Sequence, residues 1–117
     1  MKKVYVSDLD SKFKELEDVV KKYDIVKTIE ESTDVIIVPG GMSTFSDIFE
    51  AARLRKNIFL YNRDLYFSGL TDNLYKGHLE GYIEGAPASY MHIESDINDL
   101  VKDMEEDYDK FNNGKGR

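Results

Sequence analysis

The sequence predicts an α/β protein built on a parallel sheet with helices on both faces. Short runs of β-type apolar residues alternate along the chain with segments in which apolar residues recur every three or four positions. The strongest run, 34–38, has four apolar residues in succession, as in a strand that is covered on both faces. The length of 117 residues fits one domain. We therefore expect a single compact, three-layer domain over residues 1–111 and a flexible tail at 112–117.

Five strands are predicted from runs rich in Val, Ile, Tyr and Phe. They cover residues 4–6, 25–26, 34–38, 57–61 and 90–93. The run at 25–26 is short, and the segment 28–32 that follows it fits either a loop or a single helical turn. Each of the other runs is followed by polar or turn-forming residues.

Four amphipathic helices are expected between and after the strands, over 11–23, 44–55, 65–79 and from about residue 97. Their apolar positions follow the helical period and are Phe13, Leu16, Val20 and Tyr23; Phe45, Ile48, Phe49 and Ala52; Tyr66, Leu70, Leu74 and Leu79; and Ile97, Leu100, Val101 and Met104. Strands that alternate with helices in this way form a doubly wound, Rossmann-like parallel sheet.

The negative charge is concentrated near the end of the chain. There are 16 Lys and Arg residues against 23 Asp and Glu, a formal net charge of −7, and residues 94–110 alone hold eight acids and two bases. With no basic stripe, we expect no binding of long nucleic acid. The chain has no Cys and no apolar run near the roughly 20 residues of a membrane span. We predict a cytoplasmic protein with no membrane association, no metal site and no cofactor.

The chemistry is expected where the central strand passes into the next helix, at Pro39, Gly40, Gly41, Met42, Ser43 and Thr44. In open parallel sheets, ligands bind at the carboxyl ends of strands. The two glycines allow a ligand to approach the backbone, and a helix that starts near Ser43 directs free N–H groups and partial positive charge toward it. This combination is typical of a phosphate or anion site.

Four further residues are candidates for the same site. Asp47, one turn inside the helix, could accept a hydrogen bond from a ribose hydroxyl. Ser7 and Asp8 follow the first strand, and Asn62 ends the strand 57–61, so all three belong to the same edge of the sheet. Spacing alone leaves a second interpretation open, in which the glycines form only a tight turn, Thr44 is an N-cap and Asp47 suits the helix dipole.

The segment 39–47, Pro-Gly-Gly-Met-Ser-Thr-Phe-Ser-Asp, resembles the P-G-G-x-G-T-x-x-E motif of the LOG (lonely guy) family, once labelled "lysine decarboxylase-like". The segments 33–34, 57–62, 64–70 and 80–83 are similar to the motifs that surround it in that family, in the same order. The resemblance extends over about residues 33–106.

The resemblance implies a nucleotide site. LOG enzymes cleave the N-glycosidic bond of nucleoside monophosphates, and the related SLOG domains bind nucleotide-derived signals such as ADP-ribose isomers. By this resemblance Gly40, Gly41, Ser43 and Thr44 hold a phosphate, and Asp47 takes the place of the catalytic Glu. The chain departs from the motif at Ser43, which replaces a glycine, and at Asp47, which is shorter than Glu. It also lacks the upstream Arg-Lys pair and the first glycine-rich loop of the family.

Two functions follow from this comparison. The first is a small SLOG-like protein that binds a nucleotide or an ADP-ribose-type (cyclic ADP-ribose-like) signal as a sensor or a sequestering sponge. The second is an enzyme, either a nucleotide N-glycosidase (phosphoribohydrolase) that uses Asp47 or a protein like the nucleoside deoxyribosyltransferases. We also expect a homodimer or higher homo-oligomer that pairs through the exposed aromatic residues of 66–82.

Overall fold

The computed structural model describes residues 2–10, 13–41, 43–70, 73 and 91–113, and for 107–113 it describes the backbone alone. A five-stranded sheet forms its centre. The strands are β1 (Lys3–Val6), β2 (Asp24–Ile25), β3 (Asp34–Ile37), β4 (Asn57–Tyr61) and β5 (Met91–Glu94). All neighbours are parallel and lie in the order β2-β1-β3-β4-β5, which confirms the predicted doubly wound, Rossmann-like sheet.

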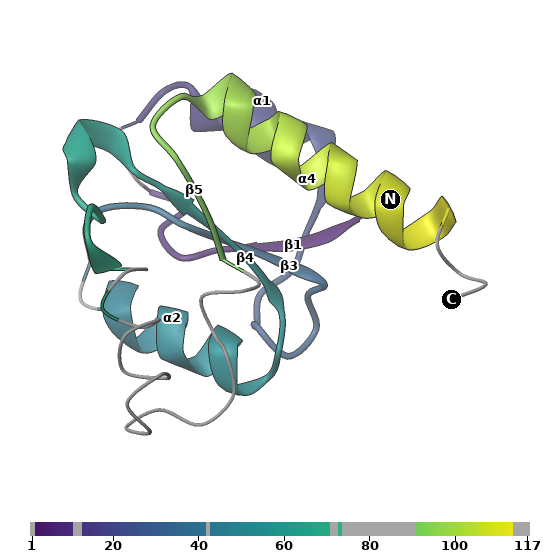
Figure 1. The fold of residues 1–117 in the computed structure, drawn as a ribbon, viewed down its shortest axis with the longest axis horizontal. Helices are drawn as coiled ribbons and strands as arrows, with labels where there is room; N and C mark the ends of the chain where they lie inside the picture. The colour runs from purple at the N-terminus through teal and green to yellow at the C-terminus, as the bar shows by residue number, and fades with distance from the viewer. Residues whose placement is uncertain (1, 11–12, 42, 71–72, 74–90, 114–117) are drawn as a thin grey trace.

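Helices cover both faces of the sheet. Figure 1 shows α1 (Leu16–Lys22) and α4 (Ile97–Asn113) on one face and α2 (Thr44–Arg53) on the other. A 3₁₀ turn, η1 (Arg63–Leu65), follows β4. The three-layer arrangement expected from the alternation of strands and helices is therefore present. Among the described residues, none of the helices combines the length and the apolar character needed to cross a membrane.

Each central strand contributes side chains to two separate cores because its side chains alternate between the faces. In β3, Ile36 packs with α1 and α4, whereas Val35 and Ile37 pack with α2, and all three are fully buried. Burying a side chain of this size stabilises the fold by roughly 1.5–3 kcal/mol. The uninterrupted apolar run 35–38 thus has the cause inferred from the sequence, which is cover on both faces.

Two predicted helices differ from the observed ones. Helix α1 begins at Leu16 rather than at 11, and Phe13 precedes it, yet Phe13 is buried because its ring packs edge-on against Tyr61 with centroids 5.9 Å apart. Phe45 and Phe49, two of the four apolar positions of the predicted helix 44–55, do not face the core. Helix α2 buries Thr44, Ile48 and Ala51 instead, and both Phe side chains are about half exposed.

The third predicted helix, 65–79, is preceded by a turn that the sequence did not predict. Asp64 and Leu65 have φ of 58° and 60°, so the backbone bends sharply before any helix can begin. Tyr66, an apolar position of the predicted helix, is exposed, whereas Phe67, which lies outside that apolar pattern, is buried. Most of the remaining segment, with Leu74 and Leu79, lies outside the described residues.

The last helix confirms its predicted apolar face: Leu100 and Met104 are buried, and Ile97 and Val101 pack against the same core. It continues to Asn113 and therefore includes 112 and 113, two residues that we expected in the tail.

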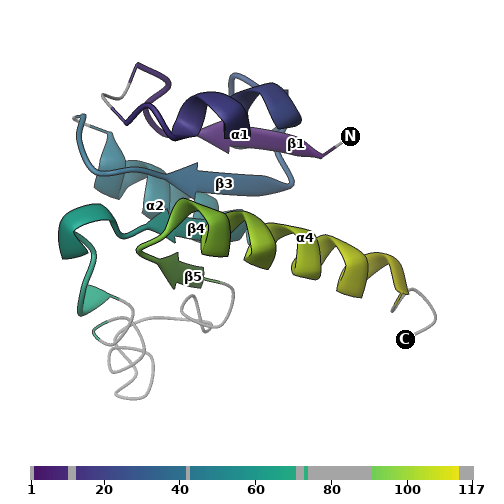
Figure 2. The ribbon, with the colours of Figure 1, turned by 90° about the horizontal axis from the view of Figure 1, so that it is seen from above.

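The strand order creates one switch point, between β1 and β3. From β1 the chain moves outward to β2, then crosses back to β3 and continues in the opposite direction to β4 and β5. Helices α1 and α2 therefore leave neighbouring strands toward opposite faces. In Figure 2 the arrowheads of β1, β3 and β5 point the same way, toward the edge where these connections begin, and β4 is parallel to its neighbours β3 and β5. In sheets of this kind the crevice at the switch point is the usual ligand site.

Candidate functional site

The turn after β3 lies at this switch point. Gly40 and Gly41 have φ of +113° and +80°, conformations that side chains other than glycine rarely adopt, and both residues are exposed. A Cβ atom placed on either glycine would lie 3.9 Å from Oδ2 of Asp8. The structure thus brings Asp8 next to the glycine turn, as the shared sheet edge predicted. Pro39 is half-buried, and Met42 lies outside the described residues.

Ser7 joins the ends of β1 and β3. Its hydroxyl oxygen accepts a hydrogen bond from the N–H of Val38 at 3.0 Å, and its own N–H donates to the carbonyl of Ile36 at 2.9 Å. Because the hydroxyl oxygen is used as an acceptor, its proton is still available to an acceptor in the crevice. Ser7 therefore connects the two strand ends and keeps a hydroxyl donor at the carboxyl edge of the sheet.

Several N–H groups in the first turn of α2 have no acceptor among the residues that the structure describes. The N–H of Asp47 donates to the carbonyl of Ser43 at 2.8 Å and is the first internal bond of the helix. The side chain of Ser43 makes no capping hydrogen bond. Within the described part of the chain, the N–H groups of Thr44, Phe45 and Ser46 donate to no protein acceptor, and the same holds for Gly40 and Gly41. Unused N–H groups at the start of a ten-residue helix favour an anion.

Thr44 stabilises the glycine turn through its hydroxyl. Its side chain is buried, and its hydroxyl donates to the carbonyl oxygen of Gly40, with the carbonyl of Val38 at 3.5 Å. The hydroxyl is consequently occupied inside the protein. Of the two hydroxyls predicted as ligand donors, that of Ser43 is exposed and that of Thr44 holds the glycine turn.

Asp47 is half-buried, and Tyr5 holds it in place. The hydroxyl of Tyr5 donates to Oδ2 of Asp47 at 3.0 Å. Burial, followed by the hydrogen bond and the charge of Asp47, raises the pKa of Tyr5 to about 12, so the phenol stays a donor at neutral pH. The sequence interpretation missed Tyr5. The available signal was the alternation in β1, because Tyr5 must face α2 when Val4 and Val6 face α1.

The side chain of Asn62 is used within its own turn. Its amide nitrogen donates to the hydroxyl of Ser68 at 3.2 Å, and its oxygen accepts from the N–H of Phe67 at 2.6 Å. Asn62 is also buried. It therefore shapes the 62–68 turn, and the structure does not direct its polar atoms toward the glycine turn.

Arg63 also has partners at this edge of the sheet. Its guanidinium lies 2.6 Å from Oε2 of Glu15 and 4.6 Å from the centroid of the Phe13 ring. The hydroxyl of Tyr61 donates to the same carboxylate oxygen. This hydrogen bond first, and the charge of Arg63 in addition, hold the pKa of Glu15 below its usual value. The cluster connects the loop before α1 with the end of β4, and it pairs the guanidinium of Arg63 with a carboxylate of the protein itself.

In the described ranges, no group of three or more His, Cys, Asp and Glu residues could hold a metal ion. His92 instead stacks on Phe59 with ring centroids 4.9 Å apart.

Comparison with known proteins adds no family to this description. No protein-family model matches the chain, and no curated protein matches it significantly.

Proposed function

We propose that the chain binds a small nucleotide-type ligand, of the mononucleotide or ADP-ribose kind, at the switch point between β1 and β3. The observation that carries the proposal is a set of N–H groups around Gly40, Gly41 and the first turn of α2 that have no acceptor among the described residues, on an exposed turn at the carboxyl edge of a parallel sheet. Such a set favours a phosphate. The resemblance of 39–47 to the LOG motif supports the same ligand class.

Asp8 determines how the ligand is oriented. A carboxylate this close to the glycine turn repels a phosphate that lies directly beside it, but it accepts hydrogen bonds from sugar hydroxyls. We therefore place the phosphate against the start of α2 and the ribose against Asp8. The hydroxyl of Ser7 is a further donor to the ligand.

Binding without turnover is the preferred form of this proposal. Hydrolysis of an N-glycosidic bond needs a carboxylate for the developing oxocarbenium ion and a group that protonates the leaving base. Asp47 could be the first of these groups. Arg63, which follows β4 at the same edge of the sheet, is paired with Glu15 and is not free to clamp a phosphate. The protein would then act in the cytoplasm as a sensor or a sequestering sponge for the nucleotide.

The test is a titration with AMP and ADP-ribose, followed by calorimetry and by mass spectrometry of the recovered ligand. We expect binding and recovery of the intact nucleotide. Asp8→Ala should weaken nucleotide binding about tenfold or more but leave the weaker binding of inorganic pyrophosphate unchanged, because pyrophosphate has no sugar. Asp10→Ala is the matched control, since Asp10 is exposed and only its backbone N–H contacts Asp8. Absence of binding by both nucleotides would contradict the proposal.

The enzyme remains the second candidate because Asp47 is held by Tyr5 in a defined position. This alternative predicts the release of free adenine from AMP, with loss of the activity in Asp47→Asn and a smaller loss in Tyr5→Phe. Free adenine at the same rate in wild type and Asp47→Asn would exclude Asp47 as the catalytic residue.

A homodimer is also part of the proposal. Four large apolar side chains are about half exposed or more on α2 and the turn after β4, namely Phe45, Phe49, Leu65 and Tyr66, and we call them the aromatic patch. Rings of Phe45 and Tyr66 lie 6.2 Å apart, so the patch joins the two segments. Of the predicted 66–82 surface, Tyr66 is in this patch, and 74–82 lie outside the described residues.

A further inference from the structure

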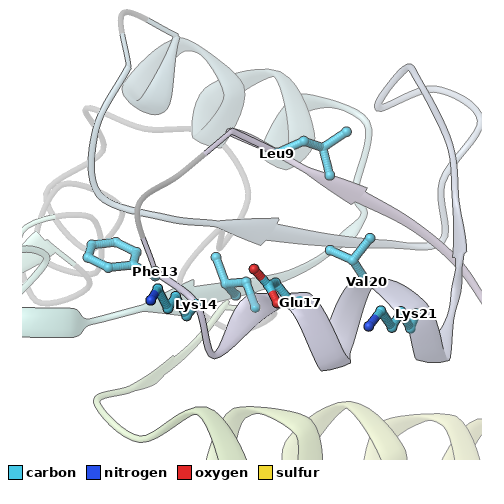
Figure 3. A pocket seen from close by; sticks show the side chains of 7 residues that line it. Leu9, Phe13, Lys14, Glu17, Val20 and Lys21 are labelled. Atoms are coloured by element: carbon cyan, nitrogen blue, oxygen red, sulfur yellow. The ribbon is translucent and has the colours of Figure 1, made fainter.

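A hollow lies between the loop after β1 and helix α1, and Leu9, the residue after Asp8, is part of its lining. Its volume is about 290 Å³. Figure 3 shows the apolar side chains of Leu9, Phe13 and Val20 around it, with Lys14 just before α1 and Glu17 and Lys21 on α1. A volume near the lower end of the usual range for ligand pockets, roughly 300–1,000 Å³, suits one ring system better than a complete dinucleotide.

Two apolar side chains of the cavity wall differ in their surroundings, since Phe13 is held by neighbouring side chains and Leu9 is exposed to solvent. Phe13 is fixed, because Tyr61 packs edge-on against its ring and the guanidinium of Arg63 lies over it. Leu9 is 57% exposed, although it is a large apolar residue next to the site. A flat apolar group in the cavity would cover Leu9 and lie near Val20, and such burial of apolar surface is favourable.

The rim has hydrogen-bonding groups of both kinds. Lys14 and Lys21 are donors and Glu17 is an acceptor, and none of the three side chains forms a hydrogen bond or ion pair with the described residues. They are exposed and occur at a spacing of three and four residues. The edge of a nucleobase presents donors and acceptors together, whereas an alkyl chain would match neither. The rim therefore favours a heterocyclic base.

Two consecutive residues, Asp8 and Leu9, connect the glycine turn with the cavity. The carboxylate of Asp8 faces Gly40 and Gly41, and Leu9, the next residue, lines the cavity. We infer that this cavity takes the base of the nucleotide whose phosphate binds at the glycine turn, with the ribose at Asp8 between them. This inference rests on the proposed function, and it adds the place where the base binds and the residues that recognise it.

The experiment is an NMR titration with two reporters, the amides of Gly40 and Gly41 for the turn and the methyl groups of Leu9 and Val20 for the cavity. Ribose 5-phosphate should shift the amides alone. AMP should shift both sets and bind at least tenfold more tightly. In Leu9→Asn the affinity for AMP should fall to that for ribose 5-phosphate, which itself stays unchanged. Lys102→Asn, at an exposed position of α4 that belongs to neither the cavity nor the aromatic patch, is the control.

The outcomes separate the two proposals. If ribose 5-phosphate and AMP shift the amides but AMP leaves the methyl groups of Leu9 and Val20 unshifted, the base binds elsewhere and this inference is overturned, while the nucleotide site stands. If neither ligand shifts the amides, the proposed function fails. If AMP shifts the methyl groups but not the amides, one nucleotide does not occupy both places, and the inference is overturned because the cavity then binds a base without a phosphate at the glycine turn.

Discussion

Gly40 and Gly41 turn the chain from β3 into α2 with two successive positive φ angles. An added Cβ would meet Oδ2 of Asp8 at 3.9 Å, which is ordinary contact, so the obstacle to a side chain here is backbone conformation rather than space. Gly69 has a similar φ of +87°, and nothing lies within 4 Å of its added Cβ. Alanine variants at Gly41 and Gly69 should therefore carry similar backbone strain, and a comparison of the two separates the effect of strain from an effect on ligand binding.

We predict that Gly41→Ala and Gly69→Ala each lower the free energy of unfolding by about 1–2 kcal/mol, the cost of a left-handed conformation for an L-residue. Nucleotide affinity should fall in Gly41→Ala alone, because only that methyl group lies in the turn. Urea unfolding and calorimetry measure the two effects. Equal loss of affinity in both variants would mean that strain, and not the turn, controls binding.

Lys2 and Asp34 form an ion pair in the interior. Nζ lies 2.6 Å from Oδ2, and the two side chains are 6% and 2% exposed. Removal of one partner from a buried pair leaves an uncompensated charge and costs about 3–5 kcal/mol. We predict a loss of this size in Lys2→Met by urea unfolding. The double variant Lys2→Met/Asp34→Leu should lose less than Lys2→Met; a larger loss in the double variant would contradict this account.

Residue neighbours were predictable where strand geometry fixes them. Ser7 and Asp8 meet the turn after β3 because the carboxyl ends of parallel neighbours lie together. The bond between Tyr5 and Asp47 and the internal bonds of Asn62 were not predictable, since they depend on how α2 and the 62–68 turn pack. Local spacing contains no information about such contacts.

At the scale of elements, two carboxyl groups at the contacts between α4 and its neighbours have pKa values that are shifted in opposite directions. The hydroxyl of Tyr23 donates to Glu105 at 2.6 Å, which holds the pKa of Glu105 below its usual value. The pKa of Glu94 on β5 is raised, first by burial and then by the hydrogen bond and negative charge of Asp103, with Asp99 adding to the effect and His92 opposing it. Glu105 therefore stabilises the fold above the pKa of the unfolded chain, and Glu94 does the reverse.

We predict that Glu94→Gln raises the free energy of unfolding at pH 7. The folded carboxyl holds its proton more tightly than the unfolded one, so its contribution is fully present below about pH 4.3, the unfolded value, and is lost as the pH rises through the folded pKa. The gain in the variant should therefore disappear near pH 4. Glu106→Gln, on the exposed side of α4, should show no such change. Urea unfolding across pH 4–8 decides, and an equal gain at both ends of this range would contradict the assignment.

Element boundaries were less predictable than element types. Phe13 fits the apolar period of α1 but lies before it, because Tyr61 and Arg63 give its ring a buried place outside the helix. Phe45 and Phe49 fit the period of α2 equally well and are exposed. Periodicity identifies the apolar positions but does not say which of two neighbouring stripes faces the sheet.

At the scale of the whole molecule, the sheet was predictable because its signal is distributed along the chain. The run 34–38 indicated a central strand, and the alternation of strands with helices indicated parallel neighbours. The order β2-β1-β3-β4-β5, and with it the position of the switch point, was not predictable, because two-residue β2 gives no sign of which side of β1 it joins.

The aromatic patch is the whole-molecule feature with the clearest consequence in solution. Phe45 and Phe49 are four residues apart on α2 and so lie on one side of the helix, and Phe45 belongs to the turn whose N–H groups are proposed to bind phosphate. A second copy on this surface would cover apolar side chains and add a wall to the site. We predict that the chain sediments at micromolar concentration with about twice its mass of 13.5 kDa.

Phe49→Lys tests this arrangement, because Phe49 is 53% exposed and its replacement leaves the core intact. The charge should oppose pairing, and the variant should sediment as a monomer with weaker nucleotide binding. Leu9→Lys is a control of similar exposure outside the aromatic patch and should remain a dimer. A monomeric wild type, or a Phe49→Lys variant that still pairs, would remove the aromatic patch from the dimer interface. The nucleotide site would then have to be formed by one chain alone.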